Sequence, residues 1–287
     1  MINFHVESGA DVTVACIQKP IEQASAFGVM GLNEEGDIIN FVEKPENPTP
    51  MPNDDSKALI SMGIYIFNVD VLDAELRQAL ACPNYQHDFG HNIIPSLIGR
   101  SNLKGYVFTE RGHPGANAYW RDVGHVDEYY AATMDLLAPT PELDIYDKSW
   151  PIMTNQLQRP GAKFLFNDPN RRGYAVDSVV CAGAIISGAH VTHTLVSYDV
   201  RIDDFSEVTD CILLPNSSIG QNCKLNRVIV GDNCHIPNGI EIGIDLELDK
   251  QRFTVTEGGI VLVTEDMFPL QDTNSQSAEN KQATLTV

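Results

Sequence analysis

The chain has 287 residues, 43% of them hydrophobic, and a formal net charge of -20. This length suits two domains with buried cores better than one. The negative charge argues against nucleic acid or an anionic membrane surface as the main partner, because both repel an acidic protein. Any phosphate-bearing ligand must therefore be held by a few local donors.

The six cysteines are scattered, and none has the close spacing of a zinc site or a redox pair. We therefore predict buried, reduced thiols. The N-terminus lacks the charged-then-apolar pattern of a secretion signal, and no apolar run approaches bilayer length. We expect a cytoplasmic protein that does not enter a membrane.

The first half of the chain has the pattern of an α/β domain, which we place at residues 1–137. Its first helix is expected to turn Ile2, Phe4 and Val6 inward, and the strand that would precede this helix is missing. The predicted elements, in order, are a helix end at 1–9, a strand at 11–17, a hairpin at 27–43, a loop at 45–55, a strand at 61–67, helices at 69–81 and 89–98, a strand at 104–109 and a helix at 125–137.

The second half is organised by a repeat, and we place a β-helix at residues 178–264 after a linker at 138–177. A tail at 265–287 follows, of which 271–287 is predicted to be disordered. Many aliphatic residues in the repeat recur at a step of seventeen, which ordinary antiparallel strands would not explain. The positions that show this step are Val191, Val208 and Leu225; Val196, Leu213 and Val230; and Ile202, Ile219 and Ile236.

Three sides per coil is the simplest interpretation, with each coil stacking its inward aliphatic residue on the coil before. Such rods occur as scaffolds, as oligomer contacts and as acyltransferase bodies. The fold alone therefore assigns no chemistry.

Polar residues that could carry chemistry gather at the end of one predicted strand. Glu43 and Lys44 end the hairpin, and Pro45 stops its ladder. Polar groups at a strand end are well placed for a site in an open α/β sheet. Gly28 and Gly63 lie in strand-like settings, where they mark either a close approach of a ligand or bulges.

Five motifs carry a resemblance to a known family. They are FGVM at 27–30, FVEKP at 41–45, SMGIYIF at 61–67, HDFG at 87–90 and YWRDVG at 119–124, followed by the repeats. In this order they resemble the bacterial glucose-1-phosphate adenylyltransferases of glycogen synthesis. The resemblance implies a partial, Rossmann-like nucleotidyltransferase sheet followed by a left-handed β-helix of hexapeptide repeats. It also implies that the substrates are ATP and glucose 1-phosphate, and that the subunits form a homotetramer.

The resemblance assigns substrate binding to Gly28, Glu43, Lys44 and Ser61. Lys44 would contact the sugar phosphate as a point charge, and Glu43 would accept hydrogen bonds from sugar hydroxyls. From the residues alone, Glu43 would pair with Lys44, and both Gly28 and Ser61 would be structural.

Asp122 is implied as the catalytic carboxylate and as a ligand of Mg²⁺, a cation that prefers carboxylate oxygen. The residues alone favour a partner for Arg121 or a cap for the next helix. Asp88 and His125 are left out of the catalytic set, because a lone residue of either type beside a helix start is usually structural.

The chain also departs from the family pattern. No glycine-rich phosphate loop precedes Gly28. We therefore expect a fragment or a misplaced start, without the first third of the enzyme and with little turnover alone. Relatives respond to fructose 1,6-bisphosphate and AMP through basic residues, whereas this chain has Asp232, Glu265 and Asp266 near those positions. We expect a weakened effector response, because acidic groups repel phosphates.

Two alternatives stay open. The first is a non-catalytic subunit that binds sugar phosphate or assembles with partners through the rod. The second is a hexapeptide acyltransferase in which His190, His193 or His235 acts as a base, although the preceding α/β half would then be unexplained. The residues do not decide which nucleotide base is bound.

Overall fold

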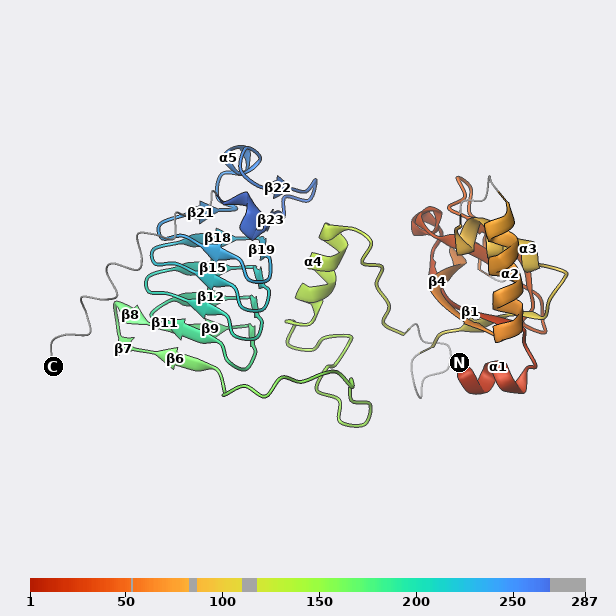
Figure 1. Cartoon of the computed structure of the whole chain (residues 1–287), viewed down its shortest axis with the longest axis horizontal. Helices are drawn as coiled ribbons and strands as arrows, with labels where there is room; N and C mark the ends of the chain where they lie inside the picture. Colours follow the sequence, from red (N-terminus) through yellow and green to blue (C-terminus); the bar gives the residue numbers. More distant parts are fainter. Residues whose placement is uncertain (53, 83–86, 110–117, 269–287) are drawn as a thin grey trace. The chain divides into compact units, whose positions relative to one another are not determined.

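The computed structural model describes residues 1–52, 54–82, 87–109 and 118–268, and the chain divides into two compact units (Figure 1). Unit 1 is Met1–Trp120 and unit 2 is Arg121–Val287. Unit 1 contains a mixed sheet with helices, and unit 2 contains stacked coils of short parallel strands. The predicted architecture, an α/β sheet followed by a β-helix, is confirmed.

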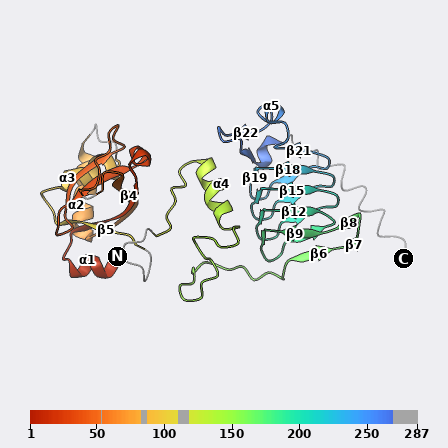
Figure 2. The same cartoon turned by 180° about the vertical axis from the view of Figure 1, so that it is seen from behind.

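Unit 1 is built on a five-stranded sheet of order β3-β2-β4-β1-β5, in which only the β1–β5 pair is parallel. Helices α2 and α3 lie on one face of it (Figures 1 and 2). Its elements are α1 (Ile2–Glu7), β1 (Val12–Pro20), η1 (Ile21–Ala26), β2 (Gly28–Leu32), β3 (Ile38–Glu43), β4 (Lys57–Phe67), α2 (Val69–Ala81), the π-helix η2 (Phe89–Ile93), α3 (Ile94–Leu97) and β5 (Leu103–Val107).

The predicted hairpin is confirmed, because β2 and β3 pair antiparallel around the expected turn. The predicted strand at 61–67 is part of a longer strand, β4, which begins at Lys57. The single helix expected at 89–98 is instead a π-helical turn followed by α3, which carries Pro95 in its first turn. Proline lacks an N–H group and so suits the start of a helix.

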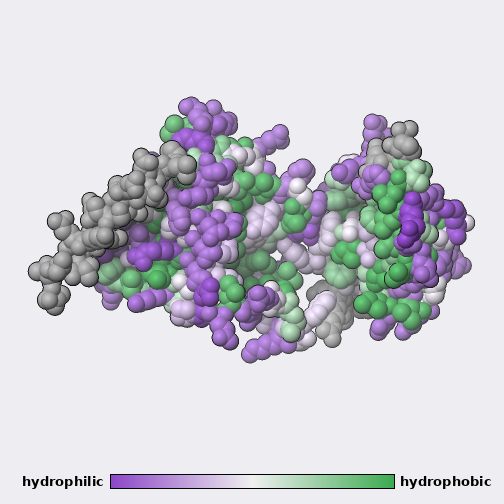
Figure 3. Space-filling view, viewed as in Figure 1, coloured by the Kyte–Doolittle hydropathy of each residue, from purple (hydrophilic) through white to green (hydrophobic). Residues whose placement is uncertain are grey.

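The inward face expected for the first helix is wrong for Ile2 and Val6, whereas Phe4 is half-buried and its ring lies 5.3 Å from that of Tyr106. Ile2 and Val6 are 70% and 71% exposed, whereas His5 is buried. The ring of His5 makes two polar contacts, from Nδ1 to Thr13 Oγ1 at 2.8 Å and from Nε2 to Asn68 Oδ1 at 3.3 Å. Because both ring nitrogens have polar partners, His5 can be buried, and α1 packs on the rest of unit 1 through this polar residue. Figure 3 shows hydrophobic residues on the surface of unit 1.

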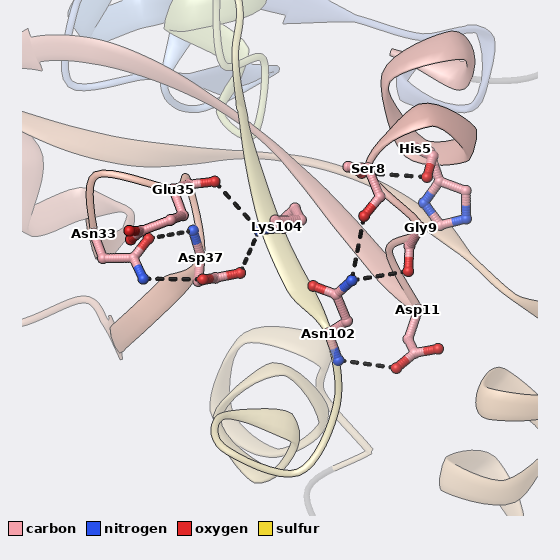
Figure 4. Close-up of polar contacts among 9 residues, drawn as sticks. All are labelled: His5, Ser8, Gly9, Asp11, Asn33, Glu35, Asp37, Asn102 and Lys104. Carbon is pink, nitrogen blue, oxygen red and sulfur yellow. Dashed lines mark hydrogen bonds and ion pairs between the residues drawn. The ribbon is translucent and has the colours of Figure 1, made fainter.

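The sheet of unit 1 curls so that the tip of the β2–β3 hairpin reaches the opposite edge strand, β5 (Figure 4). Lys104 Nζ lies 2.5 Å from Asp37 Oδ1 and donates to Glu35 O at 3.2 Å. The backbone N–H of Gly105 donates to Gly36 O at 2.9 Å. This contact fixes the tip of the hairpin, while its other end carries Glu43.

Unit 2 is a three-sided β-helix. Its three sheets have the orders β10-β13-β16-β19-β23-β22, β20-β17-β14-β11-β6 and β21-β18-β15-β12-β9 (Figures 1 and 2). Its elements are α4 (Val126–Asp135), β6 (Lys163–Leu165), β7 (Asn167–Asp168), β8 (Arg171–Arg172), β9 (Tyr174–Val176), β10 (Val179–Val180), β11 (Ile185–Ser187), β12 (His190–Thr192), β13 (Leu195–Val196), β14 (Arg201–Ile202), β15 (Glu207–Thr209), β16 (Ile212–Leu213), β17 (Ser218–Ile219), β18 (Lys224–Asn226), β19 (Val228–Val230), β20 (His235–Ile236), β21 (Glu241–Ile242), α5 (Leu246–Asp249), β22 (Thr254–Val255), β23 (Val261–Val263) and η3 (Glu265–Met267).

The step of seventeen residues is the register of the coils. Ile202 pairs with Ile219, which pairs with Ile236, and all three are buried in one core cluster. The corners repeat with the same step, because Asp199, Asn216 and Asn233 each have a positive φ between 55° and 59°. Asparagine and aspartate tolerate this left-handed conformation better than most residues. The corner chemistry and the aliphatic core therefore repeat together.

The segment 138–177, expected to be a linker, carries the first strands of the β-helix. Strand β6 pairs with β11 and β9 pairs with β12, both parallel and in register. Helix α4, expected at the end of the first domain, packs on the outer face of the coils. Its Tyr130 hydroxyl donates to Asp210 O at 2.7 Å, and the Tyr130 ring lies in a cluster with Ile212 and Ile229.

Among the described residues, no helix is long and apolar enough to cross a bilayer. Within the region expected to be the C-terminal tail, Glu265–Met267 form η3. The whole segment predicted to be disordered, 271–287, lies outside the described residues, as do residues 269 and 270.

We expect Ile219→Ala to destabilise unit 2 by about 2–5 kcal/mol, because it leaves a cavity in the stacked core. Ile244→Ala is the matched control, since Ile244 is 55% exposed and Ile219 is fully buried. Urea unfolding followed by circular dichroism measures both. Equal losses of stability in the two variants would show that the inward column does not hold the coils together.

Candidate functional site

Three of the predicted site residues share one face of the sheet in unit 1. Gly28 pairs directly with Glu43, and the pairing of Val29 with Ile60 places Gly28 beside Ser61. Side chains that pair directly on antiparallel strands point to the same face. The residues two positions along these strands, Met30, Phe41 and Leu59, are buried in the core beneath η2 and α3. Gly28, Glu43 and Ser61 therefore lie on the same face of the sheet as this core, next to it along the strands.

The carboxylate of Glu43 lies between two glycines. A Cβ atom at Gly28 would lie 2.7 Å from Glu43 Oε2 and 2.5 Å from Phe41 Cζ. A Cβ atom at Gly90, on η2, would lie 2.9 Å from Glu43 Cδ and closer still to its Oε2. Real Cβ atoms are almost never so close to other heavy atoms. The space that Glu43 occupies thus exists because both neighbours lack a side chain.

Asp88 brings the start of η2 to this carboxylate. As the N-cap residue of η2, it accepts a hydrogen bond at Oδ1 from the backbone N–H of His91 at 2.7 Å. Its charge also acts on Glu43. Burial, followed by the negative charge of Asp88, raises the pKa of the Glu43 carboxyl, while His91 and Lys44 oppose the shift.

Ser61 is buried beside an irregularity in β4. The register between β1 and β4 shifts between the Val14 and Cys16 pairs, and Gly63 has a φ of +70°. The hydroxyl of Ser61 accepts from the Gly63 N–H at 3.2 Å. The bulge interpretation of Gly63 is therefore confirmed, since a positive φ at a register shift is the usual setting for glycine.

Tyr65 follows the bulge and joins the same cluster. Its ring stacks on Phe89 with centroids 5.4 Å apart. Burial raises the pKa of the Tyr65 hydroxyl, a hydrogen bond with Ser61 lowers it, and the charges of Glu43 and Asp88 raise it. The Tyr65 hydroxyl therefore lies near the polar side chains of Ser61, Glu43 and Asp88, while its ring packs on the aromatic ring of Phe89.

Lys44 lies directly after β3 and is exposed. Its φ is +48°, and its backbone N–H donates to Phe27 O at 3.0 Å. This hydrogen bond fixes the turn that leaves the strand. An ammonium group on an exposed side chain beside a half-buried carboxylate can contact an anionic ligand without itself being desolvated.

Asp122 lies in unit 2, whereas Gly28, Glu43, Lys44 and Ser61 lie in unit 1. It is exposed and does not cap α4, because the N-cap residue is His125, which makes no side-chain capping hydrogen bond. Over residues 1–52, 54–82, 87–109 and 118–268, no group of three His, Cys, Asp or Glu side chains could hold a metal ion. A cation at Asp122 would need further oxygen ligands from water or a bound substrate.

The three histidines of the acyltransferase alternative all contact neighbouring coils. The His190 ring stacks on Tyr174 with centroids 4.6 Å apart. His193 Nδ1 lies 2.5 Å from Asp210 Oδ1, and His235 Nδ1 lies 2.8 Å from Ser218 Oγ. These contacts give each histidine a structural role.

The acidic residues near the expected effector positions make local hydrogen bonds. Glu265 Oε2 accepts from the His235 N–H at 2.6 Å, and Asp266 Oδ1 accepts from the Thr264 hydroxyl at 2.5 Å. Asp232 Oδ2 accepts from Asn233 Nδ2 at 3.0 Å. Their oxygens accept hydrogen bonds from the rod, and the exposed side chains add negative charge to its surface.

Sequence reasoning missed Tyr65, Asp88 and Gly90 as members of the cluster. Two of these residues, Asp88 and Gly90, lie in the HDFG motif at 87–90, and Tyr65 lies in SMGIYIF at 61–67. These two motifs were therefore the part of the sequence that could have indicated the three residues. The contact of Gly90 with Glu43 is a tertiary one that no local pattern contains.

Comparison with known proteins supports both halves of this description. A family model described as nucleotidyl transferase matches residues 1–139, and one described as GlmU-like, C-terminal hexapeptide matches residues 160–263. The chain is homologous to glucose-1-phosphate adenylyltransferases of bacteria.

Three of these relatives show the extent of the similarity. The protein of Methylobacillus flagellatus is 47% identical over 93% of this chain and 63% of its own length. That of Methylococcus capsulatus is 48% identical over 93% of this chain and 62% of its own length. That of Nitrosospira multiformis is 45% identical over 92% of this chain and 62% of its own length. The chain thus spans less than two thirds of the length of these curated relatives.

We expect Glu43→Gln to make unit 1 more stable at pH 7, and to have little effect near pH 4. The raised pKa means that the folded state holds the Glu43 proton more tightly than the unfolded state. Ionisation therefore costs stability as the pH rises from the ordinary value of 4.5 through the folded pKa. Thermal unfolding at both pH values measures this effect. Glu46→Gln, at an exposed residue of the same unit, is the control. A variant that is less stable at pH 7 would contradict the described surroundings of Glu43.

Proposed function

We propose that this protein acts as a glucose-1-phosphate adenylyltransferase, converting ATP and α-D-glucose 1-phosphate to ADP-glucose and pyrophosphate in glycogen biosynthesis. One observation carries the proposal. The half-buried carboxylate of Glu43, held between Gly28 and Gly90, lies next to the exposed cation of Lys44 at the end of β3. This arrangement suits a ligand that has hydroxyl groups at one end and a phosphate at the other.

Each residue of the cluster has a separate task in the proposed reaction. Lys44 binds the sugar phosphate, while Glu43 and the Ser61 hydroxyl hydrogen-bond sugar hydroxyls. Gly28 contributes through its missing side chain, which leaves room for the Glu43 carboxylate that contacts the sugar. A phosphate oxygen of glucose 1-phosphate then attacks the α-phosphorus of ATP, and the bond from this phosphorus to the bridging oxygen breaks to release pyrophosphate. Such phosphoryl transfer depends on positioning and charge stabilisation more than on covalent catalysis.

Asp122 is the residue that we assign to Mg²⁺ and to catalysis. It is exposed, and its single carboxylate fits the way Mg²⁺ binds proteins, through one or two carboxylates with the remaining positions taken by water and substrate phosphates. When bound, the ion would offset negative charge on the triphosphate and the leaving pyrophosphate.

The remaining assignments concern the setting of the reaction. We place the protein in the cytoplasm as a homotetramer, and we expect a weak response to phosphorylated effectors because Asp232, Glu265 and Asp266 add negative charge to the rod. The supporting observation for the last point is that all three side chains are exposed. Sedimentation and effector titration test these assignments.

A second candidate function is sugar phosphate binding without turnover. It is supported by the position of the cluster, because Gly28, Glu43, Lys44 and Ser61 all lie in unit 1, so that sugar phosphate binding needs no residue of unit 2. Sugar phosphate binding that can be measured by calorimetry, combined with no release of pyrophosphate, would favour this candidate. Consumption of acetyl-CoA would favour an acyltransferase instead.

We expect Lys44→Ala to weaken the binding of glucose 1-phosphate at least tenfold, because a charge-assisted hydrogen bond contributes about 1.5–3 kcal/mol. Isothermal titration calorimetry measures the dissociation constant. Lys57→Ala is the matched control, since Lys57 is a second lysine of unit 1, with a partly exposed side chain whose Nζ lies 3.3 Å from Asp54 Oδ2. Unchanged affinity in Lys44→Ala would show that the sugar phosphate does not bind at this strand end.

We expect Asp122→Asn to raise the Mg²⁺ concentration needed for half-maximal pyrophosphate release by at least about tenfold, since an amide is a weaker ligand for a hard cation than a carboxylate. Affinity for glucose 1-phosphate without Mg²⁺ should stay the same. Asp127→Asn is a poor control because Asp127 binds Thr256, so exposed Asp144→Asn is used instead. An unaltered Mg²⁺ requirement would show that Asp122 does not contact the ion.

A further inference from the structure

We propose that Gly90 is a positioning residue: its missing side chain, together with that of Gly28, sets the direction in which the Glu43 carboxylate faces the bound sugar. The inference rests on the proposed function, because it assumes that Glu43 is the ligand of the sugar hydroxyls. Gly90 itself makes no hydrogen bond to the sugar in this proposal and acts only through Glu43.

The first part of the argument is steric and concerns both sides of the carboxylate. On the β2 side, a Cβ atom at Gly28 would lie 2.7 Å from Glu43 Oε2. On the η2 side, a Cβ atom at Gly90 would lie 2.9 Å from Glu43 Cδ, and 3.3 Å from Asp88 Oδ1. Two elements from different parts of the chain therefore leave one narrow space, and the carboxylate fills it.

The second part of the argument excludes the usual reason for a glycine. Gly9, Gly36 and Gly63 of unit 1 have positive φ values, at which any side chain is strained. Neither Gly28 nor Gly90 is among the described glycines with a positive φ. Alanine could therefore adopt the backbone conformation at Gly90, and the objection to it is the volume already occupied by Glu43.

The third part concerns how firmly Gly90 is held. Gly90 is buried, and the hydrogen bond from the His91 N–H to Asp88 Oδ1 caps the helical turn that contains it. On its far side, Ile93 and Ile94 are buried in the core of the sheet. Moving the η2 backbone away from an added methyl group would disturb the packing of Ile93 and Ile94, whereas the Glu43 side chain can rotate about its own bonds, so we expect the Glu43 side chain to move.

Such a movement matters for recognition because hydrogen bonds between a carboxylate and sugar hydroxyls depend on direction. A displacement of about 1 Å in a positioned group can cost up to 10²-fold in the function that it serves. Gly90 is thus a determinant of hexose recognition that touches no part of the hexose.

The test compares Gly90→Ala with the wild type by calorimetric titration of glucose 1-phosphate. We expect the affinity to fall at least tenfold, on the order of the loss for a misplaced group. Gly31→Ala is the matched control, because Gly31 lies on β2 and a Cβ atom there would meet only ordinary contacts at 3.8 Å. Its affinity should equal that of the wild type.

Two further measurements separate positioning from a general structural role. Glu43→Asp shortens the side chain by one methylene group, so its effect should be non-additive with that of Gly90→Ala, and the double variant should bind better than the two separate losses predict. The pKa of Glu43, followed by carbon NMR, should move towards its ordinary value in Gly90→Ala, because the displaced carboxylate gains solvent.

The outcomes are distinct. Wild-type affinity in Gly90→Ala overturns the inference, and so does a loss of affinity with an unchanged Glu43 pKa and strictly additive effects. If Gly90→Ala does not fold, adding Glu43→Ala should restore folding, and failure to do so also overturns it. If the wild type itself does not bind glucose 1-phosphate, the proposed function fails, while the pKa comparison still decides whether Gly90 positions Glu43.

Discussion

The pairing of β2 with both β3 and β4 is the constraint on which the site depends. Because Gly28 pairs with Glu43 and lies beside Ser61, the register of three strands sets which side chains meet on one face. A shift of one residue in this register would turn each of them to the opposite face. The bulge at Gly63 lies within β4, two residues beyond Ser61, so the irregular part of β4 borders the site without disturbing its pairing with β2.

The β-helix of unit 2 differs from this sheet, because the same contact between aliphatic residues of neighbouring coils is repeated along it. Each coil buries its aliphatic residues on its neighbour, so the free energy of one coil depends on the next. The corners repeat residues that accept a left-handed backbone. Helix α4 lies outside this repeat and is held by Tyr130 against the face of the coils. The Asp122 segment directly precedes α4 and belongs to the same unit.

The sequence was sufficient for features that repeat or lie close together in the chain. The coils and the hairpin belong to this class, since periodicity and turn residues encode them locally. It was insufficient where distant residues meet: Gly90 reaches Glu43 only after η2 folds onto the sheet. It was also misleading where a polar residue replaces an apolar one, as in α1, whose buried His5 finds partners in Thr13 and Asn68. The first strands of the rod escaped detection because their pairing residues, such as Ala175, break the aliphatic pattern.

The contact between the hairpin tip and β5 has a consequence for solubility. Strands β3 and β5 are the two edges of the sheet, and exposed edges can recruit strands from other molecules. Where the tip reaches across, the Asp37–Lys104 bridge occupies backbone groups of the β5 edge that would otherwise be open to another chain. The charged side chains of Lys104 and Asp37 at this junction also disfavour pairing with a strand of another molecule. The curl of the sheet therefore covers part of the β5 edge at the end of the hairpin opposite Gly28 and Glu43.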